Sequence, residues 1–137
     1  MLKKFAVLFL AAVLPVLALS GCATTSTVEG KPIISSSVGK IKDGVTTEKQ
    51  VISMLGNPYS IEEDPLNGTR TLKYRFYYRR LLHLGSEIVT SSTRKYNEKL
   101  DVITKNGIVI SHSFSSEGNI SLDEAIRNSG AGGTGNK

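Results

Sequence analysis

An Asn-Gly pair between two apolar segments is the feature that most constrains the fold. Asn106-Gly107 separates residues 96–104 from residues 108–114, in the stretch YNEKLDVITKNGIVISHSF. Asn-Gly favours a tight turn, so the two segments are predicted to form a β-hairpin. A two-residue loop would pair Ile103 with Ile110, whereas a three-residue loop would pair Val102 with Ile110. We prefer the three-residue loop because it gathers the apolar side chains on one face. These are Leu100, Val102, Ile108, Ile110 and Phe114.

A third strand is predicted from the strict alternation of residues 71–78, TLKYRFYY. One face of this strand is apolar and aromatic, and the other face carries Lys73, Arg75 and Tyr77. A period of two with one apolar face indicates a strand that is buried on one side only. Residues 79–95 lack a clean pattern, and we expect a long excursion or an irregular hairpin there.

Two helices are predicted from their N-terminal capping signals. Thr47-Glu48-Lys49-Gln50 matches the capping box, and an apolar stripe follows until Gly56 and Pro58 stop the helix. A second such signal at Ser121 predicts a short helix to about residue 128.

The only cysteine of the 137 residues, Cys22, follows an uncharged apolar run over residues 5–19. Lys3 and Lys4 precede this run, which is the layout of a secretory signal. Catalysis, metal binding and simple packing would each need partners or surroundings that this position lacks. The remaining interpretation is a lipid anchor, because Leu19-Ser20-Gly21-Cys22 is similar to a bacterial lipoprotein signal. An N-acyl diacylglycerol group on Cys22 would hold the chain stably at a membrane, since several acyl chains bind together.

We therefore expect four regions in the chain. Residues 1–21 form a lipoprotein signal peptide, residues 22–37 a lipidated flexible tether, residues 38–128 the folded domain and residues 129–137 a flexible tail. The alternative for the tether is that Pro32-Ile33-Ile34 docks on the domain as an extended segment. Removal of the signal peptide with its two lysines would lower the net charge from +5 to +3, a value that does not by itself indicate nucleic acid.

Few residues suggest chemistry. The two histidines, His83 and His112, are not part of a catalytic or metal motif, and we expect His112 to be a partly buried, satisfied side chain. Glu62, Glu63 and Asp64 are expected to form a solvated turn and not a cation site. A basic cluster interleaved with aromatics could bind an acidic protein or anionic lipid headgroups, or it could simply face water. It comprises Arg70, Lys73, Arg75, Arg79 and Arg80. Because the chain is expected to be exported, we do not expect nucleic acid to be a partner of this cluster.

The order of these features resembles the small outer-membrane lipoprotein family BamE, also called SmpA or OmlA. The features that carry the resemblance follow the lipidated cysteine in a fixed order. They are Gly44-Val45-Thr46, Val51, Leu55-Gly56-Asn57-Pro58, the aromatic strand Tyr74 to Tyr78 and the hairpin of residues 100–114.

The resemblance implies an α+β fold in which two short helices pack on a three-stranded antiparallel sheet. It implies a non-enzymatic accessory scaffold subunit of the β-barrel assembly machinery, on the periplasmic face of the outer membrane, that touches other subunits and binds an anionic phospholipid. No cofactor or metal is expected. The partner-binding residues that it implies by position are Tyr59, Asp64, Pro65, Leu66, Lys73 and Arg75. The alternative is the same fold with a different envelope partner, such as a secretion-system component or a periplasmic enzyme that it inhibits.

Overall fold

A long antiparallel sheet organises the chain. The computed structural model describes residues 23–84, 87–88 and 93–130. Its strands are β1 (Ala23–Gly30), β2 (Ser60–Asp64), β3 (Thr69–Leu84), β4 (Glu87–Ile88), β5 (Arg94–Lys105) and β6 (Ile108–Gly118). Its helices are α2 (Ser35–Val38), α3 (Glu48–Leu55) and α4 (Leu122–Ser129).

The strands form one six-stranded sheet whose main path is β1-β3-β5-β6, with β2 and β4 each paired to β3. The chain divides into two compact units. The smaller unit includes β4, which pairs with His83 and Leu84 of β3. The larger unit contains residues 26–80 and 94–130, and the core and the candidate docking surface described below lie within it.

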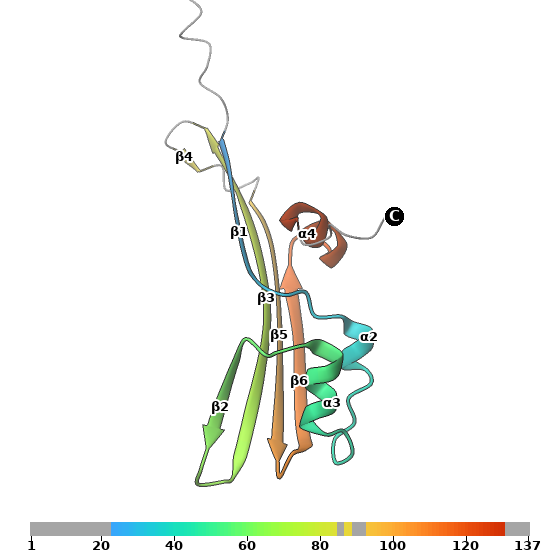
Figure 1. Cartoon of the computed structure of the whole chain (residues 1–137). Coiled ribbons are helices and arrows are strands. Elements are labelled where there is room, and N and C mark those ends of the chain that lie inside the picture. Colours follow the sequence, from blue (N-terminus) through green and yellow to red (C-terminus); the bar gives the residue numbers. More distant parts are fainter. Residues whose placement is uncertain (1–22, 85–86, 89–92, 131–137) are drawn as a thin grey trace, which may run out of the picture. The chain divides into compact units, whose positions relative to one another are not determined.

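The predicted fold, two short helices on a three-stranded antiparallel sheet, is wrong. The described residues form a more extensive sheet with three short helices (Figure 1). The main physical reason is that β3 and β5 continue far beyond the aromatic stretch. Their pairing runs from Thr69↔Lys105 to Arg80↔Arg94, into the region expected to be an excursion.

Two strands follow one another along the same edge of β3. β5 occupies the other edge over residues 69–80. On the edge of β3 away from β5, β2 pairs with residues 69–73. Further along the same edge, just after β1 ends, Lys31 donates its backbone N–H to the Arg75 carbonyl. Gly30 makes this approach possible, because a Cβ there would lie 1.8 Å from the Arg75 oxygen.

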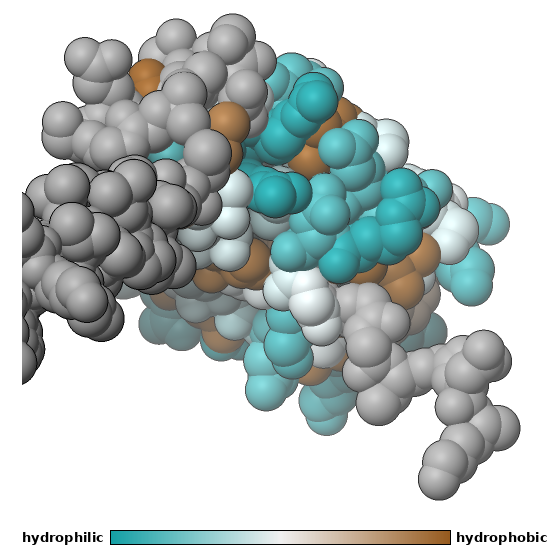
Figure 2. Space-filling view, turned by 90° about the horizontal axis from the view of Figure 1, so that it is seen from above, coloured by the Kyte–Doolittle hydropathy of each residue, from teal (hydrophilic) through white to brown (hydrophobic). Residues whose placement is uncertain are grey.

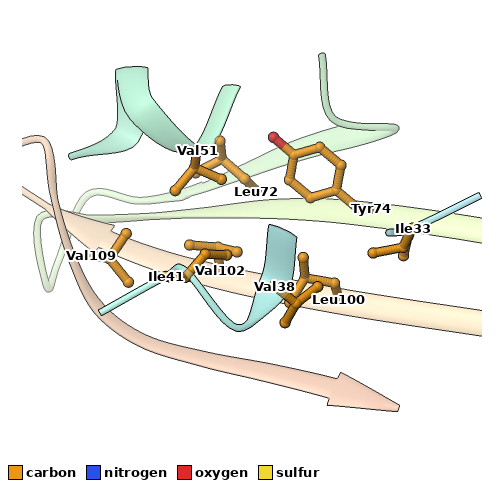
Figure 3. Close-up of a cluster of buried hydrophobic side chains, with 9 residues drawn as sticks. All are labelled: Ile33, Val38, Ile41, Val51, Leu72, Tyr74, Leu100, Val102 and Val109. Carbon is orange, nitrogen blue, oxygen red and sulfur yellow. The ribbon is translucent and has the colours of Figure 1, made fainter. Parts of the chain in front are cut away.

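The main core lies on one face of the sheet, under α2 and α3 (Figure 3). Side chains from β3, β5 and β6 meet Val51 of α3 and Val38 of α2 there. The buried residues are Ile33, Val38, Ile41, Val51, Leu72, Tyr74, Leu100, Val102 and Val109. A second cluster continues along the same strands, where Phe76 and Tyr78 pack against Ala125 of α4.

Both predicted helices are present and begin at the predicted caps. The Thr47 side chain accepts a hydrogen bond from the Gln50 N–H, and the Gln50 side chain accepts one from the Thr47 N–H, which completes the capping box of α3. Ser121 accepts a hydrogen bond from the Glu124 N–H at the start of α4. These are local signals, which is why the sequence alone identifies them.

The predicted β5–β6 hairpin is present, but the register that we preferred from the sequence, with a three-residue loop, is wrong. Lys105 pairs with Ile108, so the loop has two residues, and Asn106 and Gly107 have φ angles of 52° and 77°. A bulge then shifts the pairing between Ile103 and Thr104, so that Val102 lies opposite His112. As a result Val109 is buried and Ile110 is 47% exposed, the reverse of the expected pattern.

The region expected to be a tether has regular structure in its described part. Residues 23–30 form β1 and residues 35–38 form α2. Between them Ile33 is 3% exposed, and its N–H donates a hydrogen bond of 2.8 Å to the carboxylate of Glu98. The alternative in which the Pro32-Ile33-Ile34 segment docks on the domain matches this arrangement.

Candidate docking surface on β2 and β3

The six partner-binding residues implied by the resemblance all lie on one hairpin. Tyr59 precedes β2, Asp64 ends it, Pro65 and Leu66 lie in the turn, and Lys73 and Arg75 lie on β3. Because Asp64 pairs with Thr69, Arg75 lies six strand residues from the turn, or about 20 Å. The structure therefore brings these residues onto one surface, with the turn at one end.

The turn between β2 and β3 is held by the carboxylate of Asp64. One oxygen accepts hydrogen bonds from the N–H groups of Leu66 and Asn67, at 3.1 and 3.3 Å. The other accepts one from the Asn67 side-chain amide at 2.7 Å. The Asn67 side-chain bond, followed by the backbone bonds, lowers the pKa of Asp64, so the carboxylate that fixes the turn stays ionised at neutral pH.

Leu66 is the most exposed large apolar residue of the described chain, at 97%. A single exposed leucine is ordinary on a protein surface. This one differs because the turn that carries it is held by two backbone hydrogen bonds to Asp64 and by a third from the Asn67 side chain. A side chain presented by a rigid turn loses less conformational entropy when a partner pocket encloses it.

Tyr59 and Arg75 form the other end of the surface. The guanidinium carbon of Arg75 lies 5.5 Å from the centre of the Tyr59 ring, a cation–π distance. Tyr59 is 59% exposed and borders a hollow of about 220 Å³ between the end of β1 and the start of β2. The hollow is lined by both cations and apolar groups, including Lys31, Pro32, Pro58 and Arg75.

The face of the sheet opposite the core carries closely spaced positive charges. Arg75 lies directly across from Lys99, and Arg79 directly across from Lys95. All four side chains are exposed. We call these four residues the basic face. Like charges directly opposite one another on neighbouring strands are unfavourable, so an anionic partner that bridges them would relieve the repulsion.

Three members of the predicted basic cluster are not part of the basic face. Two of them, Arg70 and Arg80, lie on the other face of β3, because they alternate with Lys73, Arg75 and Arg79 along the strand. Arg70 pairs with Glu48 of α3 and with Glu63. Lys73 is on the correct face, but Glu62 pairs with it and Asp101 lies opposite it on β5. The charges of Arg70 and Lys73 are therefore compensated within the chain, and the unbalanced charge lies further along β3.

The sequence did not identify Lys95 and Lys99 as part of the site. Their contribution depends on the pairing of β5 with β3. This pairing places Lys99 opposite Arg75, 24 positions earlier in the sequence, and Lys95 opposite Arg79, 16 positions earlier. The signal that could have found them is the continued alternation of β5 ahead of Leu100. In that segment Glu98 replaces an apolar residue and hides the pattern.

Two other residues considered in the sequence analysis are Cys22 and His112. Cys22 lies outside the described residues. His112 pairs with Asp43 at 2.7 Å and is partly buried, as expected. Within residues 23–130, apart from the undescribed gaps, no group of three or more potential ligands is placed to hold a metal ion. No helix in the described part of the chain is long and apolar enough to cross a membrane.

Seen from one end, the described surface is largely hydrophilic, with smaller hydrophobic areas between the polar side chains (Figure 2). Comparisons with family models, with curated proteins and with solved structures give no match for this chain.

Proposed function

We propose that this chain is a non-enzymatic lipoprotein, anchored through Cys22 on the periplasmic face of the outer membrane. In this proposal it is an accessory scaffold subunit in β-barrel assembly, and it docks on a protein partner through the β2–β3 hairpin. Leu66 inserts into an apolar pocket of the partner, and the basic face binds acidic side chains around that pocket. Anionic phospholipid headgroups are a further ligand for the same charges.

The observation that carries the proposal is the rigid presentation of Leu66. A turn fixed by Asp64 holds an apolar side chain at 97% exposure. A few well-packed anchor residues contribute most of the binding energy in many interfaces, whereas exposed charges mainly steer the encounter.

The size of the surface is consistent with a protein partner. The turn and Arg75 lie about 20 Å apart, and a standard interface covers about 800 Å² on each partner. The series of motifs that follows Cys22 resembles the BamE family. This resemblance is the reason to expect the partner among the barrel assembly subunits.

The test is recovery of partners with a tagged full-length chain from detergent-solubilised envelopes. Leu66→Ser removes the proposed anchor and leaves the Asp64 turn in place. Val45→Ser is the matched control, because Val45 is 69% exposed and lies in the turn before α3, away from the hairpin. An anchor residue contributes about 2 kcal/mol, which corresponds to about a 30-fold loss of affinity.

We expect the wild type and Val45→Ser to recover barrel assembly subunits, and Leu66→Ser to recover little of them. Recovery of a secretion-system complex or a periplasmic enzyme in their place would support the alternative and overturn the assembly role. Equal recovery by Leu66→Ser would remove the hairpin from the interface.

A further inference from the structure

The hollow beside Tyr59 lies at the edge of β3, where the end of β1 and the start of β2 meet. Its lining comes from three segments that are far apart in the sequence. They are the end of β1 with the residues that follow it, the residues that join α3 to β2, and residues 74–75 of β3. The hollow is therefore a product of the fold, and no local sequence pattern indicates it.

Backbone hydrogen bonds to β3 hold two of these segments in place. Lys31 donates its N–H to the Arg75 carbonyl at 3.2 Å, and Tyr59 donates its N–H to the Lys73 carbonyl at 2.7 Å. Binding pockets are usually largely formed before their ligand arrives. These bonds give the hollow such a fixed shape.

The lining of the hollow combines apolar surface with positive charge. The apolar part comes from proline rings, aliphatic side chains and tyrosine rings: Pro32, Ile33, Leu55, Pro58, Tyr59 and Tyr74. Lys31 and Arg75 supply the charge, and none of the described residues in the lining is Asp or Glu. A ligand that complements this lining has an apolar part directly beside a negative charge.

The two cations of the hollow are not compensated within the described chain. Lys73, two residues before Arg75 on β3, pairs with Glu62. Among the described residues, by contrast, no carboxylate forms an ion pair with Lys31 or Arg75. The Arg75 guanidinium lies over the Tyr59 ring instead, and such a planar group can donate two parallel hydrogen bonds to one carboxylate.

The size of the hollow limits what can enter it. Its volume of about 220 Å³ lies below the range of about 300–1,000 Å³ that is typical of pockets for drug-sized ligands. One side chain with an adjacent charged group is the kind of ligand that this volume suits. In a polypeptide, only a C-terminal residue carries an apolar side chain and a carboxylate on the same Cα, and capture of that carboxylate is a recurring mode of peptide recognition.

We propose that the hollow binds the C-terminal residue of a partner polypeptide, with the apolar side chain in the hollow and the carboxylate on Lys31 and Arg75. This inference rests on the proposed function, because it states which part of the docked protein reaches the Arg75 end of the hairpin. The turn that carries Leu66 lies about 20 Å away, a distance that about six residues of an extended tail cover.

The test is an NMR titration of the full-length chain in detergent with short peptides. The probe is acetyl-Gly-Ser-Gly-Ser-Leu with a free carboxylate. Its C-terminal amide lacks the charge, and the same peptide ending in serine lacks the apolar side chain. We expect the probe to shift the backbone N–H signals of Lys31 and Tyr59 saturably. The amide and the serine peptide should each bind about 10-fold more weakly.

Two glutamine variants separate binding in the hollow from a general attraction to the basic face. Arg75→Gln removes a charge from the lining. Arg79→Gln is the matched control, because Arg79 is exposed on the same face of β3 and does not line the hollow. We expect Arg75→Gln to bind the probe about 10-fold more weakly, and Arg79→Gln to bind it as the wild type does. Circular dichroism confirms that both variants are folded.

Three results would overturn the proposal. The first is no saturable shift with the probe. The second is equal affinity for the probe and either of the other two peptides. The third is an affinity for the probe that is the same in folded Arg75→Gln as in the wild type, or that falls equally in both variants.

The titration and the partner recovery report on different proposals. Leu66→Ser leaves the hollow intact, so this variant should bind the probe as the wild type does. If recovery of partners depends on Leu66 but the probe does not bind, docking through the hairpin stands and the C-terminal residue is removed from it. If the probe binds and Leu66→Ser recovers partners normally, the hollow stands and the hairpin anchor is wrong.

Discussion

Glu98 is a carboxylate in the core whose replacement tests how the N-terminal segment is attached. It is 1% exposed and lies on β5 opposite Phe76. One of its oxygens accepts the Ile33 N–H at 2.8 Å, and the other accepts the Tyr96 hydroxyl at 3.2 Å. It thus links the segment between β1 and α2 to the middle of the sheet.

Glu98→Ala leaves the Ile33 N–H buried without an acceptor. An unpaired buried donor costs about 1–3 kcal/mol, and the lost methylene adds about 0.8 kcal/mol. We expect a decrease of about 2–4 kcal/mol in the free energy of unfolding. For a domain of this size, that corresponds to roughly 10–20 °C in the melting temperature.

Glu98→Gln separates hydrogen bonding from charge. The amide keeps an oxygen for the Ile33 N–H, and it avoids burial of a negative charge. Burial raises the pKa of Glu98 above its ordinary 4.5, an effect that its hydrogen bonds from Ile33 and Tyr96 partly offset. We therefore expect the Gln variant to be at least as stable as the wild type at pH 7.

The pH dependence has a definite sign. Because the folded state holds the Glu98 proton more tightly than the unfolded state, the wild type loses stability as pH rises from about 4.5 through the folded pKa. The Gln variant lacks this loss, so its advantage should grow across that window and be constant below it. Urea unfolding of both variants from pH 4 to pH 8 measures the difference. A Gln variant that is less stable than the wild type at pH 7, or an advantage that shrinks with rising pH, would refute this reasoning.

Three further changes test other parts of the account. Val51→Ala removes two methyl groups from a side chain with no exposed surface, and urea unfolding should show a loss of about 2–3 kcal/mol; a loss below 1 kcal/mol would contradict the core assignment. Thr47→Ala removes the cap of α3 and should lower stability by about 1 kcal/mol by the same method, with exposed Ser53→Ala as the neutral control. Arg75→Glu and Lys73→Glu should both weaken partner or anionic-vesicle binding in a sedimentation assay. Arg75→Glu should have the larger effect, because Glu62 already compensates Lys73; equal binding by the wild type and Arg75→Glu would exclude the basic face.

The parts of the fold that the sequence predicts are those encoded by neighbouring residues. The capping box at Thr47, the alternation of Leu72 to Tyr78 and the Asn106-Gly107 turn each depend on a few adjacent positions. All three are present in the structure.

The errors arise where distant segments decide the outcome. The β6 bulge coincides with the pairing of residues 44–48 along its edge, and a local pattern gives no indication of that contact. Similarly, β1 has the sequence ATTSTVEG, without an apolar alternation, and it is a strand because β3 offers it an edge. Glu98 was missed because a charge in a strand usually indicates the solvent side, whereas here Ile33 and Tyr96 satisfy it inside.

The candidate site was predicted in part. The sequence and the resemblance gave the turn at Asp64 to Leu66 and the positions of Tyr59, Lys73 and Arg75, which lie on one hairpin. The charge distribution could not be predicted, because it depends on which acidic residues pair with Arg70 and Lys73 and on the β5 lysines opposite Arg75 and Arg79.

The most direct measurement of the central claim is site-specific photo-cross-linking in intact envelopes, with a photoreactive residue at position 66 and, as the control, at position 45. Docking through the β2–β3 hairpin predicts that position 66 cross-links to a barrel assembly subunit and that position 45 does not. Absence of such a product at position 66, or equal products from both positions, would contradict docking through the β2–β3 hairpin.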